Sequence, residues 1–221
     1  MVDFVQGELI AISVLIFILG LLFQVYRFFS MTCKKEWSFL NLPPKKEEVP
    51  KGGAALLTDW IASLRRTVFG SHPYLITMTF LFHFFIFIVP LFVLGHNLLL
   101  KQAWGIRFIA FPESVSDGLT LIPLFCGLFF LLRRILLKRV RVITTAYDYI
   151  VLLITLAPFL TGFLAYHQWF DYRTLIFLHI LSGEVMLMTI PFTKLGHMIF
   201  FFLYRFFIGS EYSFARGTRT W

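Results

Sequence analysis

Two histidines, His179 and His197, bracket the apolar stretch LHILSGEVMLMTIPFTKLGH at 178–197. An imidazole is expensive inside a membrane, and it can serve there as a metal ligand or a proton carrier. Their separation of 18 residues equals five turns of an α-helix. Both rings are therefore expected on one helix face, about 27 Å apart along the axis. The spacing predicts polar sites at two depths of one membrane helix.

A second apolar stretch, 73–97, carries His83 and His96. If the two stretches pack antiparallel, His96 faces His179 at one level and His83 faces His197 at the other. Two neutral imidazoles on opposite sides of a porphyrin are the axial ligands of a six-coordinate b haem, which transfers single electrons. The pattern predicts two haem b groups, with these four histidines as ligands of the haem iron.

The register of the second stretch leaves an alternative open. His83 and His96 are 13 residues apart and would lie on nearly opposite sides of an ideal helix. Pro90 lies between them and can kink the helix. His72 and His83 are 11 residues apart on one face and form a competing ligand pair. We favour His83 and His96 because both lie within the apolar span. For any single histidine, a helix–helix hydrogen bond or a place at the membrane edge is the simpler interpretation.

The elements that must position these residues are membrane helices. Of the 221 residues 58% are hydrophobic and 14% charged, and the mean hydropathy is +0.80. Five segments approach the roughly 20 apolar residues that cross a bilayer. These are 8–29, 73–97, 116–132, 146–166 and 172–204. We predict an all-α membrane protein whose single domain covers 1–221. Neither cysteine, Cys33 or Cys126, belongs to a CxxC motif, which argues against covalent haem and zinc.

The net charge of +8 is concentrated in particular loops, a pattern that indicates membrane topology rather than a surface that binds nucleic acid. Most of the 20 Lys and Arg residues lie in the first and third loops and the C-terminal tail. The positive-inside rule then predicts an outside N-terminus and a cytoplasmic C-terminus. Within the long cytoplasmic loop 30–72, the apolar spacing of 54–70 predicts an amphipathic surface helix, with Arg65 and Arg66 at the lipid headgroups. The rival interpretation is a helix that docks a partner.

The chain resembles the gamma (cytochrome b) subunit of respiratory nitrate reductase across nearly its whole length. Three stretches carry the resemblance: FH at 82–83 with GH at 95–96, RRILLKRVRVITTAYDYIVL at 133–152, and LH at 178–179 with PFTKLGH at 191–197. The resemblance implies five spans with two b haems whose ligands lie on the second and fifth spans. Carried over to this sequence, those ligands are His83, His96, His179 and His197.

Two departures point to a different branch of this group: a longer His83–His96 spacing and an extended first loop. The stretches 82–100, 157–168 and 178–198 look more like integral subunits of redox complexes in sulfate-reducing bacteria. The closest type is the small integral subunit of the high-molecular-weight cytochrome c complex, with the Tmc and Dsr complexes as neighbours. The resemblance implies anaerobic respiration at a bacterial or archaeal cytoplasmic membrane. It also implies a periplasmic multihaem cytochrome c, a cytoplasmic iron–sulfur protein and other integral subunits as partners.

Subunits of this kind exchange electrons with menaquinone or another quinone, which needs an apolar slot and a proton-exchanging group. His167 and Gln168, with Asp171 and Arg173 nearby, are the candidates, and an interfacial aromatic belt is the alternative. Glu184 is a costly carboxyl inside the fifth span. It is expected to carry protons or bond a haem edge, or else to pair with an arginine or a neighbouring subunit. The candidate partners for haem propionates are Arg65, Arg66, Arg133 and Arg134.

These observations predict an electron-transfer subunit that connects a quinone pool with partner redox subunits. Such a chain is part of a quinone oxidoreductase rather than a complete enzyme. Two other classes stay open: a haem-free membrane anchor for soluble redox subunits, and a small proton-coupled transporter. The sequence contains no HExxH, GxSxG or phosphate-binding glycine loop, so no soluble catalytic motif competes with this interpretation.

Overall fold

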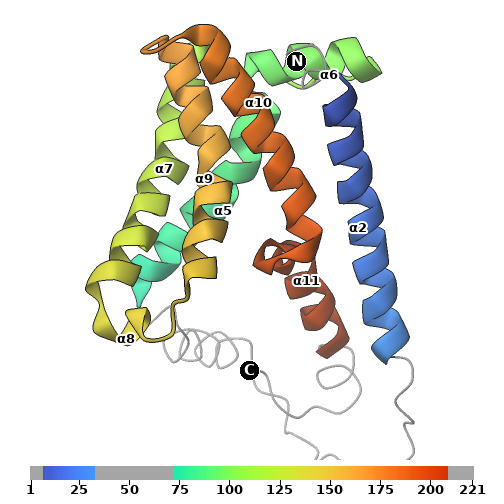
Figure 1. Cartoon of the computed structure of the whole chain (residues 1–221), viewed down its shortest axis with the longest axis vertical. Helices are drawn as coiled ribbons and strands as arrows, with labels where there is room; N and C mark the ends of the chain where they lie inside the picture. Colours follow the sequence, from blue (N-terminus) through green and yellow to red (C-terminus); the bar gives the residue numbers. More distant parts are fainter. Residues whose placement is uncertain (1–6, 33–71, 209–221) are drawn as a thin grey trace, which may run out of the picture. The chain divides into compact units, whose positions relative to one another are not determined.

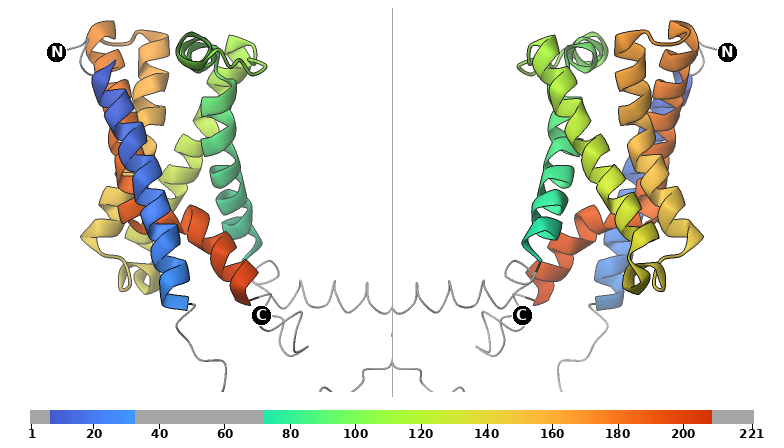
Figure 2. Two further views of the ribbon diagram at one scale, coloured as in Figure 1. Left: turned by 90° about the vertical axis from the view of Figure 1, so that its right-hand side faces the viewer. Right: turned by 90° about the vertical axis from the view of Figure 1, so that its left-hand side faces the viewer.

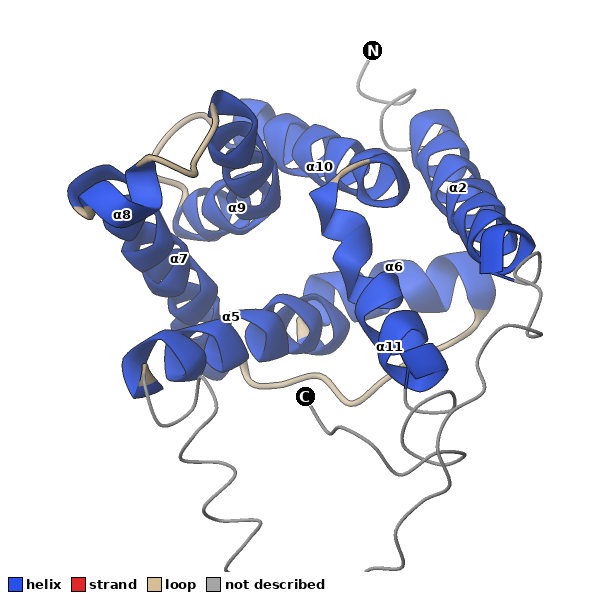
Figure 3. Ribbon diagram, turned by 90° about the horizontal axis from the view of Figure 1, so that it is seen from below, coloured by secondary structure: helices blue, strands red, loops and turns tan. Residues whose placement is uncertain are grey.

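The computed structural model describes residues 7–32 and 72–208. Within these ranges every regular element is a helix, and none is a strand (Figure 3). The predicted surface helix at 54–70, with Arg65 and Arg66, lies outside the described residues. The chain divides into two compact units, one formed by Met1–Lys51 and Glu184–Trp221, the other by Gly52–Gly183. We describe each unit by itself.

Five helices are long and apolar enough to cross a membrane. They cover Glu8–Ser30, Pro73–Phe92, Glu113–Leu136, Ala146–His167 and Tyr172–Phe192. Large apolar side chains on these helices point outward, among them Phe80 (64% exposed) and Phe125 (62%). Exposing such a surface to water costs free energy, whereas exposing it to lipid does not. The chain is therefore a multi-pass membrane protein, and the prediction of an all-α fold with five spans is confirmed.

Three long helices form the body of the unit Gly52–Gly183: α5 (Pro73–Phe92), α7 (Glu113–Leu136) and α9 (Ala146–His167). Helix α7 packs against both others and crosses α5 (Figure 2). At the α5–α7 contact, the rings of Phe82 and Phe130 meet edge to face at 5.4 Å. At the α7–α9 contact, Gly127 allows close approach, because a Cβ there would lie 2.4 Å from Leu156 Cδ2.

The replacement Gly127→Ala is expected to destabilise the α7–α9 contact. All three nearest atoms belong to Leu156, so its side chain must change rotamer, at a cost of roughly 1–3 kcal/mol. A lower thermal unfolding temperature in detergent would register this cost. Gly118→Ala is the matched control on α7, because a Cβ at Gly118 meets nothing within 4 Å. Equal unfolding temperatures for the two variants would contradict the expected close contact.

The second predicted span, 73–97, is wrong beyond Phe92. Helix α5 ends there, Val93 is extended (φ −69°, ψ 133°), and a separate helix α6 (Leu94–Trp104) begins. Helix α6 runs crosswise to α5 (Figure 1). His83 and His96 therefore lie on different helices, and the register argument against them, which assumed one continuous helix, does not apply.

The fifth predicted span, 172–204, is interrupted. Helix α10 (Tyr172–Thr189) gives way to two 3₁₀ turns, η2 (Ile190–Phe192) and η3 (Lys194–Gly196), before α11 (His197–Ile208). Thr193 between the turns is extended (φ −122°, ψ −177°). The prediction that His179 and His197 share one face of a five-turn helix is therefore wrong.

In the unit that contains both chain ends, α2 (Glu8–Thr32) packs against this interruption. A Cβ on Gly20 would lie 2.7 Å from Pro191 Cβ, so only glycine allows this approach. Gln24 Nε2 donates a hydrogen bond to the Pro191 carbonyl at 2.8 Å. Phe28 on α2 meets Tyr204 on α11 edge to face at 5.1 Å.

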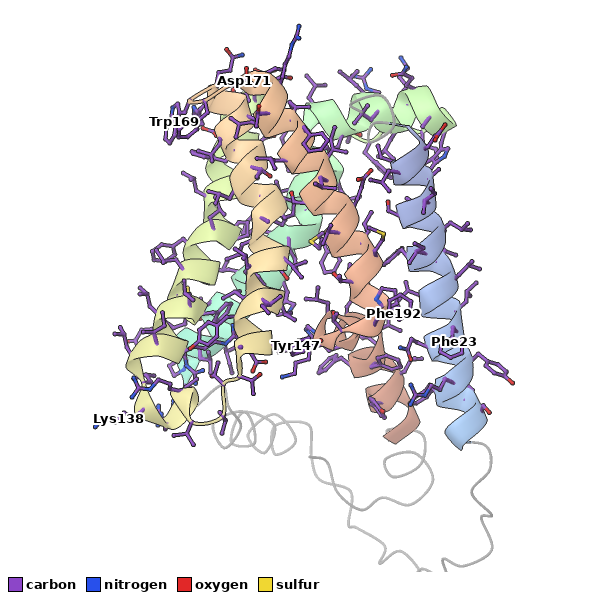
Figure 4. The ribbon with its side chains drawn as sticks, viewed as in Figure 1. Phe23, Lys138, Tyr147, Trp169, Asp171 and Phe192 are labelled. Atoms are coloured by element: carbon purple, nitrogen blue, oxygen red, sulfur yellow. The ribbon has the colours of Figure 1, made fainter. Side chains whose placement is uncertain are left out.

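The two ends of α9 have different chemistry. It begins at a capping box in which the Thr145 amide and hydroxyl both donate to Asp148. The nearby α7–α9 connection is basic and holds α8 (Lys138–Arg141). Trp169 and Asp171 lie at the opposite end of the helix from Lys138 and Tyr147 (Figure 4).

Candidate functional site

His96 on α6 and His179 on α10 lie side by side within one unit. Their ring centroids are 5.8 Å apart and their planes differ by 14°. Metal–imidazole bonds are about 2 Å long, so two imidazoles on opposite sides of one metal have ring centres roughly 6 Å apart. The observed ring separation is compatible with a metal shared by the two histidines.

Both rings are fixed through Nδ1. His179 Nδ1 lies 2.8 Å from the Pro158 carbonyl, and His96 Nδ1 lies 2.9 Å from the Pro90 carbonyl. A carbonyl only accepts, so Nδ1 carries the proton in each ring and Nε2 keeps the lone pair. This is the arrangement in which histidines usually bind metals, because the outer hydrogen bond fixes the tautomer and orientation.

Gly162 on α9 provides the space for the His179 ring. A Cβ at this position would lie 2.9 Å from His179 Cε1 and 3.0 Å from Nδ1. The same two helices are joined by Thr161 and Ser182, whose hydroxyl oxygens are 3.3 Å apart. The His179 ring therefore lies against α9, where the Pro158 carbonyl binds it and Gly162 leaves room for it.

The other two predicted ligands are held in the same way. His83 Nδ1 lies 2.7 Å from the Thr79 carbonyl on α5, and His197 Nδ1 lies 2.6 Å from the Lys194 carbonyl. These two residues belong to different units, so their pairing stays a prediction. His72, the competing ligand, is exposed at the residue preceding α5, and its side chain makes no capping hydrogen bond there.

His197 forms part of the wall of a cavity of about 650 Å³ in the unit with the chain ends. The floor is aromatic, with Phe28 and Phe200 6.4 Å apart between ring centroids. Two cations, Arg27 and Lys194, also line it. The remaining lining residues are Gln24, Thr193 and Tyr204. An apolar floor with cationic and imidazole groups suits a flat apolar molecule that carries carboxylates.

His167, the candidate proton-exchanging group, has a partner that sequence reasoning did not identify. Its Nε2 lies 3.0 Å from Asp117 Oδ1 on α7. Aromatic rings surround the imidazole, with centroids at 4.5 Å for Phe163, 5.2 Å for Tyr166 and 5.4 Å for Trp169. The site combines an acid–imidazole pair with surrounding aromatic rings.

The neighbouring candidates in this turn have local structural roles. Gln168 adopts a left-handed conformation (φ 53°) where α9 ends. Asp171 accepts hydrogen bonds from the Thr174 amide at 2.8 Å and hydroxyl at 2.7 Å, which caps α10. These bonds lower the pKa of Asp171 below its ordinary value, so it remains a carboxylate at neutral pH. His167 is therefore the better proton-exchanging candidate in this turn.

Glu184 is 3% exposed, and neither of its carboxyl oxygens has a hydrogen-bond partner among the described residues. The predicted arginine pairing is thus not seen in that part of the chain. The described residues also contain no group of three or more His, Cys, Asp or Glu side chains that could hold a metal ion. A bare metal site usually needs three or four such ligands, whereas a haem iron needs two.

The chain was also compared with known proteins. No family model matches it, and no solved structure matches it. A protein of Nitratidesulfovibrio vulgaris (strain Hildenborough) is 34% identical over 229 residues, which cover 100% of this chain and 97% of the relative. The chain belongs to the family of that protein. The relative's name is simply "Protein" and states no activity.

Sequence reasoning missed three residues at these sites. Arg27 lies at the end of the first predicted span, Asp117 near the start of the third and Gly162 within the fourth. Each acts through a residue on another element. Asp117 pairs with His167 on α9, Gly162 makes room for His179 on α10, and Arg27 lines the cavity with Lys194. Only Arg27 had a local signal, because it is a cation at the end of the first span.

Proposed function

We propose that the chain is a di-haem b subunit of a membrane redox complex that transfers electrons between a quinone pool and partner redox subunits. The observation that carries the proposal is the His96–His179 pair. Its 5.8 Å ring separation and its two Nδ1–carbonyl hydrogen bonds suit axial ligation of one haem iron. Because both axial positions are taken by protein, the haem would supply reversible one-electron transfer.

The cavity beside His197 supports a second haem with His197 as one ligand; His83, which belongs to the other unit, stays the ligand predicted from the sequence. Its volume of about 650 Å³ lies within the range of cofactor sites. Arg27 and Lys194 line the same cavity and are suited to the two propionates. They replace Arg65, Arg66, Arg133 and Arg134 as our preferred cations, because they share a wall with a proposed ligand.

We infer from the positive-inside pattern that the two sites lie at opposite membrane surfaces. With the basic α7–α9 connection in the cytoplasm, the N-terminus is outside, and His96 and His179 lie at the outer level. His83 and His197 then lie at the inner level. This arrangement suits a periplasmic multihaem cytochrome c and a cytoplasmic iron–sulfur protein as partners, with other integral subunits alongside, in a bacterial or archaeal cytoplasmic membrane.

His167 and Asp117 are the proposed proton-exchanging pair for menaquinone or another quinone. Replacing Asp117 by Asn is expected to slow reduction of the haems by a menaquinol analogue about 10²-fold while both haems remain bound. The reason is that the His167 imidazole loses the carboxylate that stabilises its protonated form. Stopped-flow absorbance measures this rate. Asp171→Asn is the control, since it removes a charge from the same turn without touching the imidazole. Equal rates for both variants would exclude the pair.

Glu184 favours one competing function, a proton-coupled transporter, because its buried carboxyl has no partner among the described residues. Haem content separates the alternatives. The full-length protein, purified with its bound pigments, is expected to contain two haem b per chain and to show a b-type reduced-minus-oxidised spectrum. A protein without haem would contradict the proposal and leave the transporter and the haem-free anchor.

A further inference from the structure

The break between α5 and α6 is closed by a complete set of hydrogen bonds. The last four carbonyls of a helix have no partner within it. Here the Val89 carbonyl accepts from the Val93 amide at 3.1 Å, and the Phe92 carbonyl accepts from the Phe111 amide at 2.9 Å. Side chains take the other two. His96 Nδ1 donates to the Pro90 carbonyl and Asn97 Nδ2 to the Leu91 carbonyl, each at 2.9 Å.

Asn97 makes three hydrogen bonds at the break, one of them to the Leu91 carbonyl. It is completely buried (0% exposed), and its Nδ2 also donates to the Val93 carbonyl at 3.2 Å. Its Oδ1 accepts from the Phe108 amide at 2.8 Å, which ties the segment after α6 to the same point. Both amide hydrogens and the oxygen are used, so the set of bonds requires a side-chain amide.

The position of the His96 ring depends on this arrangement. The Pro90 carbonyl that fixes the ring is adjacent to the Leu91 carbonyl that Asn97 holds. The rotated backbone that frees both carbonyls starts at Val93, which Asn97 also binds. If the Asn97 bonds are lost, we expect α5 and α6 to change their relative angle, and the His96 ring to move with α6.

We propose that Asn97 is a positioning residue for His96: it holds the broken α5–α6 junction in the geometry that directs His96 toward His179. The inference rests on the proposed haem function and extends it, because the hydrogen bonds of Asn97 hold the backbone of the junction and Asn97 is not a proposed ligand. The competing view is that Asn97 only anchors the segment after α6, through its Oδ1.

The variant Asn97→Asp separates these views. The aspartate keeps an oxygen for the Phe108 amide, but a carboxylate cannot donate to the Leu91 and Val93 carbonyls, and a protonated carboxyl can donate to only one of them. If Asn97 only anchors the segment, the variant binds both haems as the wild type does, even if its buried carboxyl lowers the overall stability. If it positions His96, the affinity for the haem held by His96 and His179 falls about tenfold, the lower end of the range for residues that support a metal ligand.

The experiment titrates haem into the haem-depleted full chain and records optical binding together with the EPR signal of each low-spin iron. Phe111→Leu is the control: it weakens the Phe92–Phe111 ring contact (4.9 Å) at the same junction and leaves the Asn97 bonds intact. We expect Asn97→Asp to weaken and shift one haem signal, the one lost in a His179 variant, while the other signal stays unchanged.

Three results would overturn the inference: unchanged binding in Asn97→Asp, equal loss of both haems, or the same selective loss in Phe111→Leu. The proposed function fails in a different way. If the wild-type chain binds no haem b, the function is rejected. If the wild type binds two haems and Asn97→Asp binds both normally, only the role of Asn97 is rejected.

Discussion

Replacing His179 by alanine is expected to remove one of two haem b groups per chain and to leave the other. The variant loses an axial ligand and also the Nδ1–Pro158 hydrogen bond that fixes the ring. A five-coordinate haem that depends on His96 alone has lost half of its protein ligation and should dissociate during purification. Haem-to-protein ratio and the reduced-minus-oxidised spectrum measure the loss, with an expected fall from two haems to one.

The control for this experiment is His72→Ala. His72 is the only other histidine proposed as a ligand and is exposed at the start of α5, so its removal should leave both haems. Retention of two haems in His179→Ala would refute the ligand assignment. Loss of one haem in His72→Ala would instead favour the competing His72/His83 pair.

The replacement Gly162→Ala is expected to have a comparable effect without touching a ligand. The added Cβ would lie 2.9 Å from His179 Cε1 and 3.0 Å from Nδ1, closer than atoms of this kind approach in proteins. The ring cannot move aside freely, because its Nδ1 is bonded to the Pro158 carbonyl at 2.8 Å. We expect at least a tenfold loss of affinity for one haem, or its replacement by a high-spin form, seen by haem titration and EPR.

Gly183→Ala is the matched control, because a Cβ at Gly183 on α10 meets nothing within 4 Å. Both changes favour helix formation by up to about 1 kcal/mol, so neither variant should weaken its own helix. The difference in haem affinity between Gly162→Ala and Gly183→Ala therefore reports the effect of the contact with the His179 ring. If the two variants bind both haems equally, Gly162 does not shape the site.

The membrane helices followed from composition, because lipid leaves long apolar runs few alternatives to a helix. The helix breaks did not. Pro90 and Pro191 lie near breaks, but Pro123 and Pro158 lie inside α7 and α9, which continue through them. A proline therefore does not decide where a membrane helix ends. At Val93 and Pro191 the freed carbonyls find side-chain donors, Asn97 and Gln24, and the second of these comes from a helix 167 residues away.

The site shows the same division. The residues His96 and His179 stood out in the sequence as imidazoles in apolar surroundings, and the structure brings their rings together. The prediction of continuous helices over 73–97 and 172–204 is wrong, because both stretches are interrupted. The residues that fix the His179 ring, Pro158 and Gly162, carry no local signal. Their role depends on which face of α9 meets α10, and a single sequence does not encode that contact in any short motif.

The most direct test of the account is the EPR spectrum of the oxidised full-length protein. If His96 and His179 are the two axial ligands of one haem, the spectrum contains low-spin ferric signals from haem iron with two imidazole ligands. One of those signals then disappears in both the His96→Ala and the His179→Ala variants, while another persists in each. A wild-type spectrum with no haem iron, or two variants that lose different signals, would contradict the account.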